Sequence, residues 1–164
     1  MKNDLKRILD MVKNNFENDG FISPVFIGNF QGTKKVVMID FDLNENKQSF
    51  TDNIKMLISQ GKLQEYAFIM EAWSLKTPVE NKESVNCWMD QNGSLASHPQ
   101  RQEVILVQYS NPEGEIHFMC DIIRGINEVT LGDWDKIEAK ANPISLASSG
   151  IMQSLFSKGR AEWN

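Results

Sequence analysis

Two apolar runs constrain the fold of this chain more than any other feature of its sequence. Residues 64–75 and 102–108 are rich in Val, Ile, Leu and aromatic residues, which is typical of the central strands of a sheet. The second run leads into Asn111-Pro112-Glu113-Gly114, which has Pro and Gly where a type I turn favours them. Another apolar segment follows at residues 115–124. We therefore predict that residues 102–110 and 115–124 pair as a hairpin in a mainly antiparallel sheet.

The rest of the chain shows weaker periodic patterns. Apolar residues recur at three- and four-residue spacing from Leu5 to Phe16, which indicates an amphipathic helix that ends at Asn18-Asp19-Gly20. This helix is predicted at residues 3–18. A second helix is predicted at 47–60, and two strands are predicted at 24–30 and 35–42, joined by a turn at 31–34. A short strand at 128–131 and a last helix near 145–158 complete the prediction. The order α-β-β-α-β-β-β-(α) predicts an α+β fold with helices packed on one face of the sheet.

The length of the chain favours a single domain. With 164 residues and 41% apolar residues, the chain can bury one hydrophobic core without help from disulfides or metals. Residues 1–164 show no internal repeat and no interdomain linker. Residues 76–101 contain two prolines and many polar residues, and a connection of this length is often functional.

Charge and composition narrow the classes of partner. The formal net charge of −5 disfavours electrostatic attraction to nucleic acids and to anionic lipids. The N-terminal residues lack the apolar core of a secretory signal, and no run approaches the ~20 apolar residues of a membrane span. Cys87 and Cys120 stand far apart and fit no metal or redox motif, which favours reduced thiols. We expect a cytoplasmic protein with no membrane contact and no nucleic-acid partner.

Glu71 interrupts the first apolar run. Strand alternation places this carboxylate on the same face as Ala67, Ile69 and Trp73. A carboxylate on a covered face requires a partner, because an isolated buried charge is very costly. The sequence therefore predicts that Glu71 meets an arginine and that Trp73 shields the pair.

The predicted hairpin supplies two arginines. If Ser110 lies opposite Glu115, alternation carries Arg101 and Glu103 toward Arg124 at one end of the same face. We therefore expect one cluster of charged and aromatic side chains, made of Glu71, Trp73, Arg101, Glu103 and Arg124. This cluster is either an ion pair that closes the end of the sheet or a recognition site.

Two of these segments carry a resemblance. Residues 68–73, FIMEAW, and residues 98–104, HPQRQEV, are similar to paired segments in a family of short bacterial and phage proteins, and Ile123-Arg124 resembles the end of a later strand in that family. The similarity covers about the central third of the chain. It implies that Glu71, Arg101, Glu103 and Arg124 belong together, and it implies no activity.

An enzyme is the alternative hypothesis. Asp40, Asp42, Glu65 and Glu71 could supply oxygen ligands for Mg²⁺ in a metal-dependent phosphoesterase or nuclease. A restriction-enzyme-like nuclease would have Glu-x-Lys, whereas this chain has Glu71-Ala72-Trp73. Asp40 and Asp42 also precede a predicted helix, where capping explains acidic residues.

Other catalytic and cofactor signatures are missing from the sequence. His117 is predicted to lie opposite Gln108 on the less buried face, and His98 precedes Pro99, so neither belongs to a nucleophile motif. The chain has no phosphate-binding glycine loop and no dinucleotide fingerprint, so no cofactor and no metal are expected.

We therefore expect a non-enzymatic binding or regulatory protein. Its pocket or interface would lie beside the long segment at residues 76–101, with Trp88 and His98 as additional candidates, and its partner would be a protein or a small molecule. A second alternative is a structural subunit that self-assembles through a sheet edge or through the helix near 145–158, whose small residues and apolar stripe are also typical of a core helix.

Overall fold

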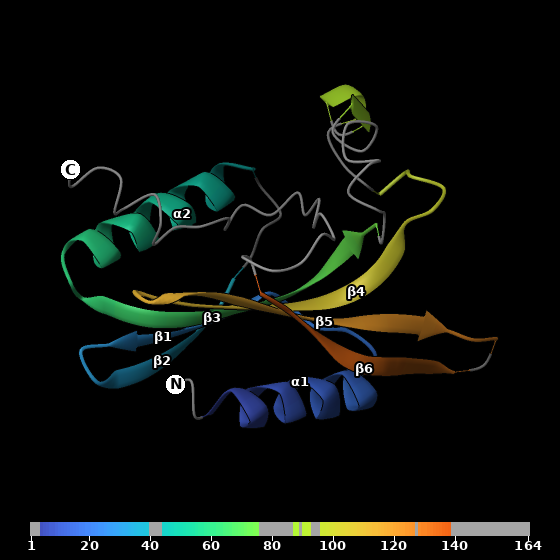
Figure 1. Cartoon of the computed structure of the whole chain (residues 1–164), viewed down its shortest axis with the longest axis horizontal. Helices are drawn as coiled ribbons and strands as arrows, with labels where there is room; N and C mark the ends of the chain where they lie inside the picture. Colours follow the sequence, from blue (N-terminus) through green and yellow to red (C-terminus); the bar gives the residue numbers. More distant parts are fainter. Residues whose placement is uncertain are drawn as a thin grey trace.

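The described part of the chain forms a six-stranded antiparallel sheet with the helices α1 and α2 packed against it (Figure 1). The computed structural model describes residues 4–39, 44–75, 87–88, 90–92, 96–126 and 128–138. Its elements are α1 (Leu5–Asp19), β1 (Val25–Phe30), β2 (Thr33–Met38), α2 (Asn44–Ser59), β3 (Leu63–Ser74), β4 (Gln102–Asn111), β5 (Gly114–Arg124) and β6 (Val129–Glu138). The strand order is β2-β1-β3-β4-β5-β6, and the predicted α+β fold with an antiparallel sheet is confirmed.

The β4–β5 hairpin has the predicted register. Ser110 lies opposite Glu115, and Asn111 pairs with Gly114. The Asn111 Oδ1 atom accepts hydrogen bonds of 2.9 Å from the backbone N–H groups of Glu113 and Gly114. The asparagine side chain therefore closes the turn that Pro112 begins.

The β1–β2 hairpin is tighter than predicted. Its turn contains only Gln31 and Gly32, with φ values of 52° and 87°, while Thr33 already pairs with Phe30. Two positive φ values are typical of a type I′ turn, which matches the right-handed twist of the flanking strands. The predicted four-residue turn is therefore a two-residue turn, because glycine allows this conformation.

The two helices lie on opposite faces of the sheet, and not on one face as predicted (Figure 1). One face, here called the α1 face, packs Ile8, Val12 and Phe16 of α1 against Ile69 and Val107. On the other face, the α2 face, Ile54 packs in a cluster with Phe26, Leu63, Tyr66 and Phe68. The reason lies in β3, whose residues 66–69 are all buried, so that both faces of the central strand need a cover.

Strand β6 extends well beyond the predicted residues 128–131. A β-bulge in its pairing with β5 occurs between Cys120 and Ile122, so that Leu131 and Trp134 both pack against the α1-face core although they are three residues apart. The bulge breaks the two-residue alternation from which a strand is recognised in a sequence.

Several predicted segments fall outside the described residues. These include the helix near residues 145–158, the aspartates at positions 40 and 42, and most of the segment at 76–101. Within that segment, residues 87–88 and 90–92 are helical, where no regular structure was predicted. Among the described helices, none is long and apolar enough to cross a membrane.

Candidate functional site

Glu71 accepts a hydrogen bond from the backbone rather than from an arginine. Its Oε1 atom lies 2.6 Å from the backbone nitrogen of Ile22, which belongs to the connection between α1 and β1. The predicted contact with Arg101 or Arg124 is thus replaced by a backbone contact. Arg124 is still close enough for the charge of Glu71 to contribute to raising the pKa of its guanidinium, after the larger effect of the Glu103 hydrogen bond.

Glu103 and Arg124 form a two-pronged ion pair across β4 and β5. The Nη2 and Nε atoms of Arg124 donate to the two carboxylate oxygens of Glu103 at 2.5 and 2.6 Å. These hydrogen bonds lower the pKa of Glu103 below its ordinary value. The side chain of Arg124 is 49% exposed and that of Glu103 is 19% exposed, so water still screens part of the attraction.

Arg101 lies over the ring of Trp73. Its guanidinium carbon is 4.9 Å from the ring centroid, which is within the range of a cation–π contact. The Nη1 atom of Arg101 also donates to the carbonyl of His98 at 3.3 Å. Trp73 is the register partner of Glu103, so this stack lies beside the ion pair.

His98 connects the stack to Trp88. The rings of Trp88 and His98 meet edge to face with their centroids 4.7 Å apart. The Nδ1 atom of His98 accepts a hydrogen bond of 3.1 Å from the backbone N–H of Gln100. Contacts therefore run without a break from Trp88 through His98 and Arg101 to Trp73.

These residues form one surface, which we call the tryptophan–arginine surface. It consists of Trp73, Trp88, His98, Arg101, Glu103 and Arg124. Glu71 lies two residues before Trp73 on the same strand face.

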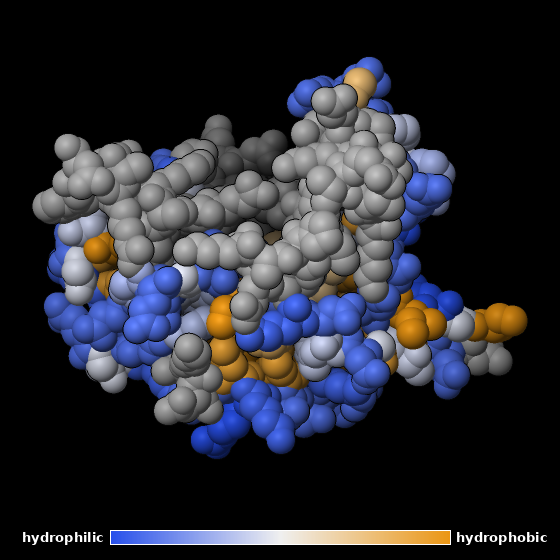
Figure 2. Space-filling model, in the orientation of Figure 1, coloured by the Kyte–Doolittle hydropathy of each residue, from blue (hydrophilic) through white to orange (hydrophobic). Residues whose placement is uncertain are grey.

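Exposed apolar residues extend this surface at the β5–β6 end of the sheet. Ile123 is 52% exposed, Ile126 is fully exposed and Val129 is 37% exposed. Val129 is the register partner of Arg124 and therefore lies beside the ion pair, whereas Ile123 alternates onto the opposite face of β5. Figure 2 shows apolar side chains at this tip, at the right of the view. Ile126 and Val129 were not singled out from the sequence, because an isolated apolar residue near a turn resembles an ordinary strand position, and Ile123 was named only beside Arg124 in the resemblance.

Glu65 and Glu71 do not lie together as ligands of one metal ion. They are on the same face of β3 but six residues apart, which corresponds to roughly 20 Å along a strand. Glu65 instead accepts hydrogen bonds from the Tyr109 hydroxyl at 2.6 Å and from Asn29 Nδ2 at 3.0 Å. Within the described residues, no three His, Cys, Asp or Glu side chains are grouped as a metal site. Glu65 and Glu71 are therefore too far apart to bind one metal ion together, and the other two predicted ligands, at positions 40 and 42, lie outside the described residues.

A second polar group lies on the α2 face. His117 lies opposite Gln108 as predicted, but Gln108 is only 3% exposed, so this face is not the less buried one. The Nε2 atom of His117 is 2.9 Å from Glu115 Oε1, and Gln108 donates to the same oxygen. Ser110 is the register partner of Tyr66, and burial raises the pKa of the Tyr66 hydroxyl. The sequence analysis missed the group, although the predicted hairpin register already brings Gln108, Ser110, Glu115 and His117 together.

Neither thiol forms a disulfide. Cys120 is buried and its Sγ atom donates to the carbonyl of Gly132 at 3.1 Å, while burial raises its pKa to about 11. Cys87 is exposed and accepts a hydrogen bond from Gln91. A thiol with a raised pKa is a weak nucleophile, so Cys120 has the character of a core residue.

Comparisons of the chain with protein-family models, with curated proteins and with solved structures found no significant match. The resemblance to a family of short bacterial and phage proteins therefore stays a hypothesis.

Proposed function

We propose that this chain is a non-enzymatic binding or regulatory protein whose binding surface is the tryptophan–arginine surface, and that its partner is a protein with an acidic contact region. The proposal rests chiefly on Arg101. Its side chain is exposed and held over Trp73, and within the described part of the chain it has no carboxylate partner.

The contrast with Arg124 explains why Arg101 is the recognition residue. The guanidinium of Arg124 is already engaged by both carboxylate oxygens of Glu103. Arg101 donates one hydrogen bond to a carbonyl and stacks on a ring, which orients its planar group and leaves other N–H donors for a ligand. A guanidinium oriented in this way can bind a carboxylate through two parallel hydrogen bonds.

The surrounding residues favour a protein over a small molecule. Trp and Arg are enriched among the residues that dominate binding energy in protein interfaces. The exposed Val129, which is the register partner of Arg124, adds apolar area beside this arginine. Exposed apolar area bordered by charged groups is typical of a protein contact rather than of an enclosed ligand cavity.

The proposal is tested by comparative capture. The chain is immobilised and incubated with extract of its source cells, and the retained proteins are identified by mass spectrometry. The experiment is repeated with each of the variants Trp73→Ala, Arg101→Ala and Lys62→Ala. Lys62 is exposed on the connection between α2 and β3, so its replacement removes a cation elsewhere. Circular dichroism checks that every variant is folded.

We expect a polypeptide that is retained by the unmodified chain and by Lys62→Ala and lost with both other variants. Arg101→Lys should restore only part of the binding, because an ammonium keeps the charge but not the planar stack. Identical capture by all variants would place recognition elsewhere and contradict the proposal.

A further inference from the structure

Strand β2 is an exposed edge with an unusual composition. All six of its residues are exposed, and Val36, Val37 and Met38 are exposed by 66%, 44% and 70%. β2 is the last strand of the sheet, and within the described part of the chain only β1 pairs with it. An exposed apolar edge of this kind is a template for pairing with another strand.

The backbone groups on the free side of β2 belong to alternate residues. In the two-residue hairpin, Phe30 and Thr33 form the hydrogen-bonded pair next to the turn. By alternation, Lys35 and Val37 also bond toward β1, so the N–H and C=O groups of Lys34, Val36 and Met38 point outward. The bond from the Ile39 N–H to the Pro24 carbonyl at 2.9 Å agrees with this alternation.

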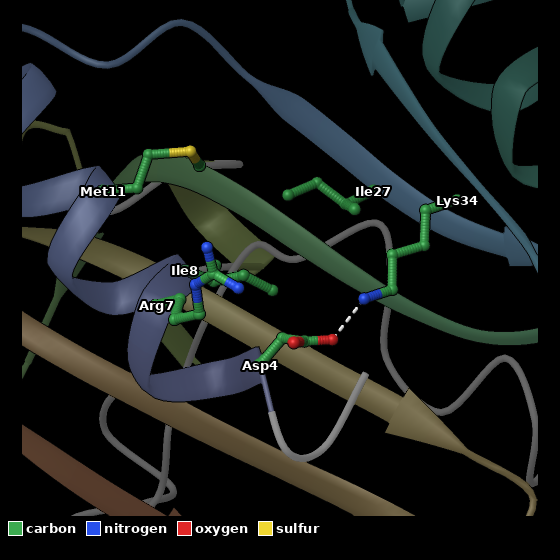
Figure 3. Close-up of a pocket in the computed structure, with 6 residues that line it drawn as sticks. All are labelled: Asp4, Arg7, Ile8, Met11, Ile27 and Lys34. Carbon is green, nitrogen blue, oxygen red and sulfur yellow. Dashed lines mark hydrogen bonds and ion pairs between the residues drawn. The ribbon is translucent and has the colours of Figure 1, made fainter.

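Two of the outward-bonding residues, Lys34 and Met38, border an apolar groove on the α1 face. Two neighbouring cavities of about 330 and 210 Å³ lie along α1 and share Met11 in their lining. Ile27 and Lys34 line the larger cavity (Figure 3). Met38 lines the smaller one. Met11 and Phe21 are 42% and 58% exposed, so the apolar area continues from β2 onto and beyond α1.

The order of residues along β2 makes the strand complementary to itself. Its first half contains Lys34 and Lys35, and its second half contains Val36, Val37 and Met38. If two copies pair antiparallel with Val36 opposite Val36, each Lys34 lies opposite Met38 and each Lys35 lies opposite Val37. Apolar stems of lysine then cover apolar side chains, and no two lysines face each other. If the register is shifted so that Val36 lies opposite Lys34, the two Lys35 side chains face each other, and their like charges disfavour that register.

Lys34 is already neutralised within its own chain. It forms an ion pair with Asp4, and this contact lowers the pKa of the Asp4 carboxyl (Figure 3). The charge at this end of the edge therefore opposes the approach of a second copy less than a free lysine would.

We infer that two copies of this chain associate through β2, which pairs antiparallel with β2 of a second copy about a two-fold axis at Val36. The two six-stranded sheets then form one continuous sheet. The contact is isologous, as in most homodimers, because the same strand supplies both sides. It lies on the opposite edge from β6 and is independent of the tryptophan–arginine surface.

Sedimentation of the full chain over a concentration series tests the association. Val36→Lys places two ammonium groups at the axis and should weaken dimerisation at least about tenfold. Val36→Pro removes an N–H that β1 does not use, so it should have a similar effect without breaking the hairpin. Met56→Lys adds the same charge at an exposed apolar position on α2 and should leave dimerisation unchanged.

Cross-linking tests the register. In a Cys87→Ser background, which removes the exposed native thiol, Val36→Cys should form a disulfide-linked dimer on mild oxidation, because directly opposite Cα atoms are about 5.5 Å apart. Thr33→Cys should not, because the two copies of that residue would be roughly 20 Å apart. A monomer at every concentration, or equal cross-linking at both positions, would overturn the inference.

Discussion

The two ends of β3 use the same residue type for different purposes. At one end, Glu65 accepts hydrogen bonds from Tyr109 and Asn29, so that β1, β3 and β4 are joined by side chains of the sheet itself. At the other end, Glu71 accepts the backbone N–H of Ile22, and the next polar groups on this face are the exposed residues of the tryptophan–arginine surface. The Glu65 carboxylate accepts hydrogen bonds from side chains of the sheet, whereas the Glu71 carboxylate holds the α1–β1 connection beside the tryptophan–arginine surface.

The difference shows what decides the role of a carboxylate in an apolar strand. Alternation places both residues on the α1 face, and neither sequence context supplies a histidine or a lysine beside them. Their roles follow from which neighbours reach them: the side chains of Tyr109 and Asn29 for Glu65, and a backbone amide in the α1–β1 connection for Glu71.

The largest effect should come from breaking the Glu71 contact. Glu71→Leu leaves the Ile22 N–H without its acceptor and should lower the free energy of unfolding by about 2 kcal/mol. Glu71→Gln keeps an acceptor oxygen and should lower the free energy of unfolding by well under half of that amount. Urea unfolding of the two variants measures the difference. Equal losses would show that charge, and not the backbone hydrogen bond, is the reason for a carboxylate at this position.

A smaller effect is expected at the other end of β3. Tyr109→Phe removes the hydroxyl that donates to Glu65 while the ring, which is only 1% exposed, continues to fill the core. We expect a loss of about 1 kcal/mol in the free energy of unfolding, because Glu65 keeps its hydrogen bond from Asn29. A loss larger than that caused by Glu71→Leu would show that the contact at Glu65 stabilises the fold more than the contact at Glu71. Chemical denaturation at neutral pH, with both variants measured together, provides the comparison.

The Glu103–Arg124 pair should contribute less than either of these contacts. Arg124→Ala should change the free energy of unfolding by under about 1 kcal/mol, because the arginine is half exposed and its partner remains accessible to water. Glu103→Gln should have an effect of similar size. If either variant is destabilised as strongly as Glu71→Leu, the pair is a structural element rather than part of a surface.

The smallest expected effect is the pH dependence of this pair. The hydrogen bond from Arg124 holds the pKa of Glu103 below its ordinary value of 4.5. A carboxyl with a lower pKa in the folded than in the unfolded state stabilises the fold fully above 4.5 and loses this contribution as the pH falls through the folded value. The stability difference between the unmodified chain and Glu103→Gln should therefore shrink in acid. A difference that persists well below that pH would contradict the ionic origin.

Much of the sheet could be predicted because its signals are local. The Asn111-Pro112-Glu113-Gly114 turn sets the β4–β5 register, and that register alone places Glu103 and Arg124 near each other. The end of α1 follows from Gly20, whose φ of 74° is easily adopted only by glycine. In these places neighbouring residues determine the backbone conformation, and strand alternation then determines which side chains share a face of the sheet.

Features that depend on distant contacts were predicted less well. The bulge opposite Cys120 and Ile122 hides the length of β6, since Leu131 and Trp134 reach the same core without a two-residue spacing. The partner of Glu71 is a backbone amide 49 positions away, and a backbone donor leaves no signature in a sequence. The opposite placement of α1 and α2 was also missed, although the continuous burial of β3 is the property that requires it.

By itself, the sequence determined an antiparallel α+β fold, the register of its central hairpin and the position of the arginines at one end of one face, because turns and strand alternation act over a few residues. Tertiary structure decided that Glu71 binds the α1–β1 connection, that Trp73 carries Arg101, and that β2 is left exposed at the edge of the sheet. These features depend on which segments meet after the chain has folded, and burial and hydrogen bonding between distant residues determine that outcome.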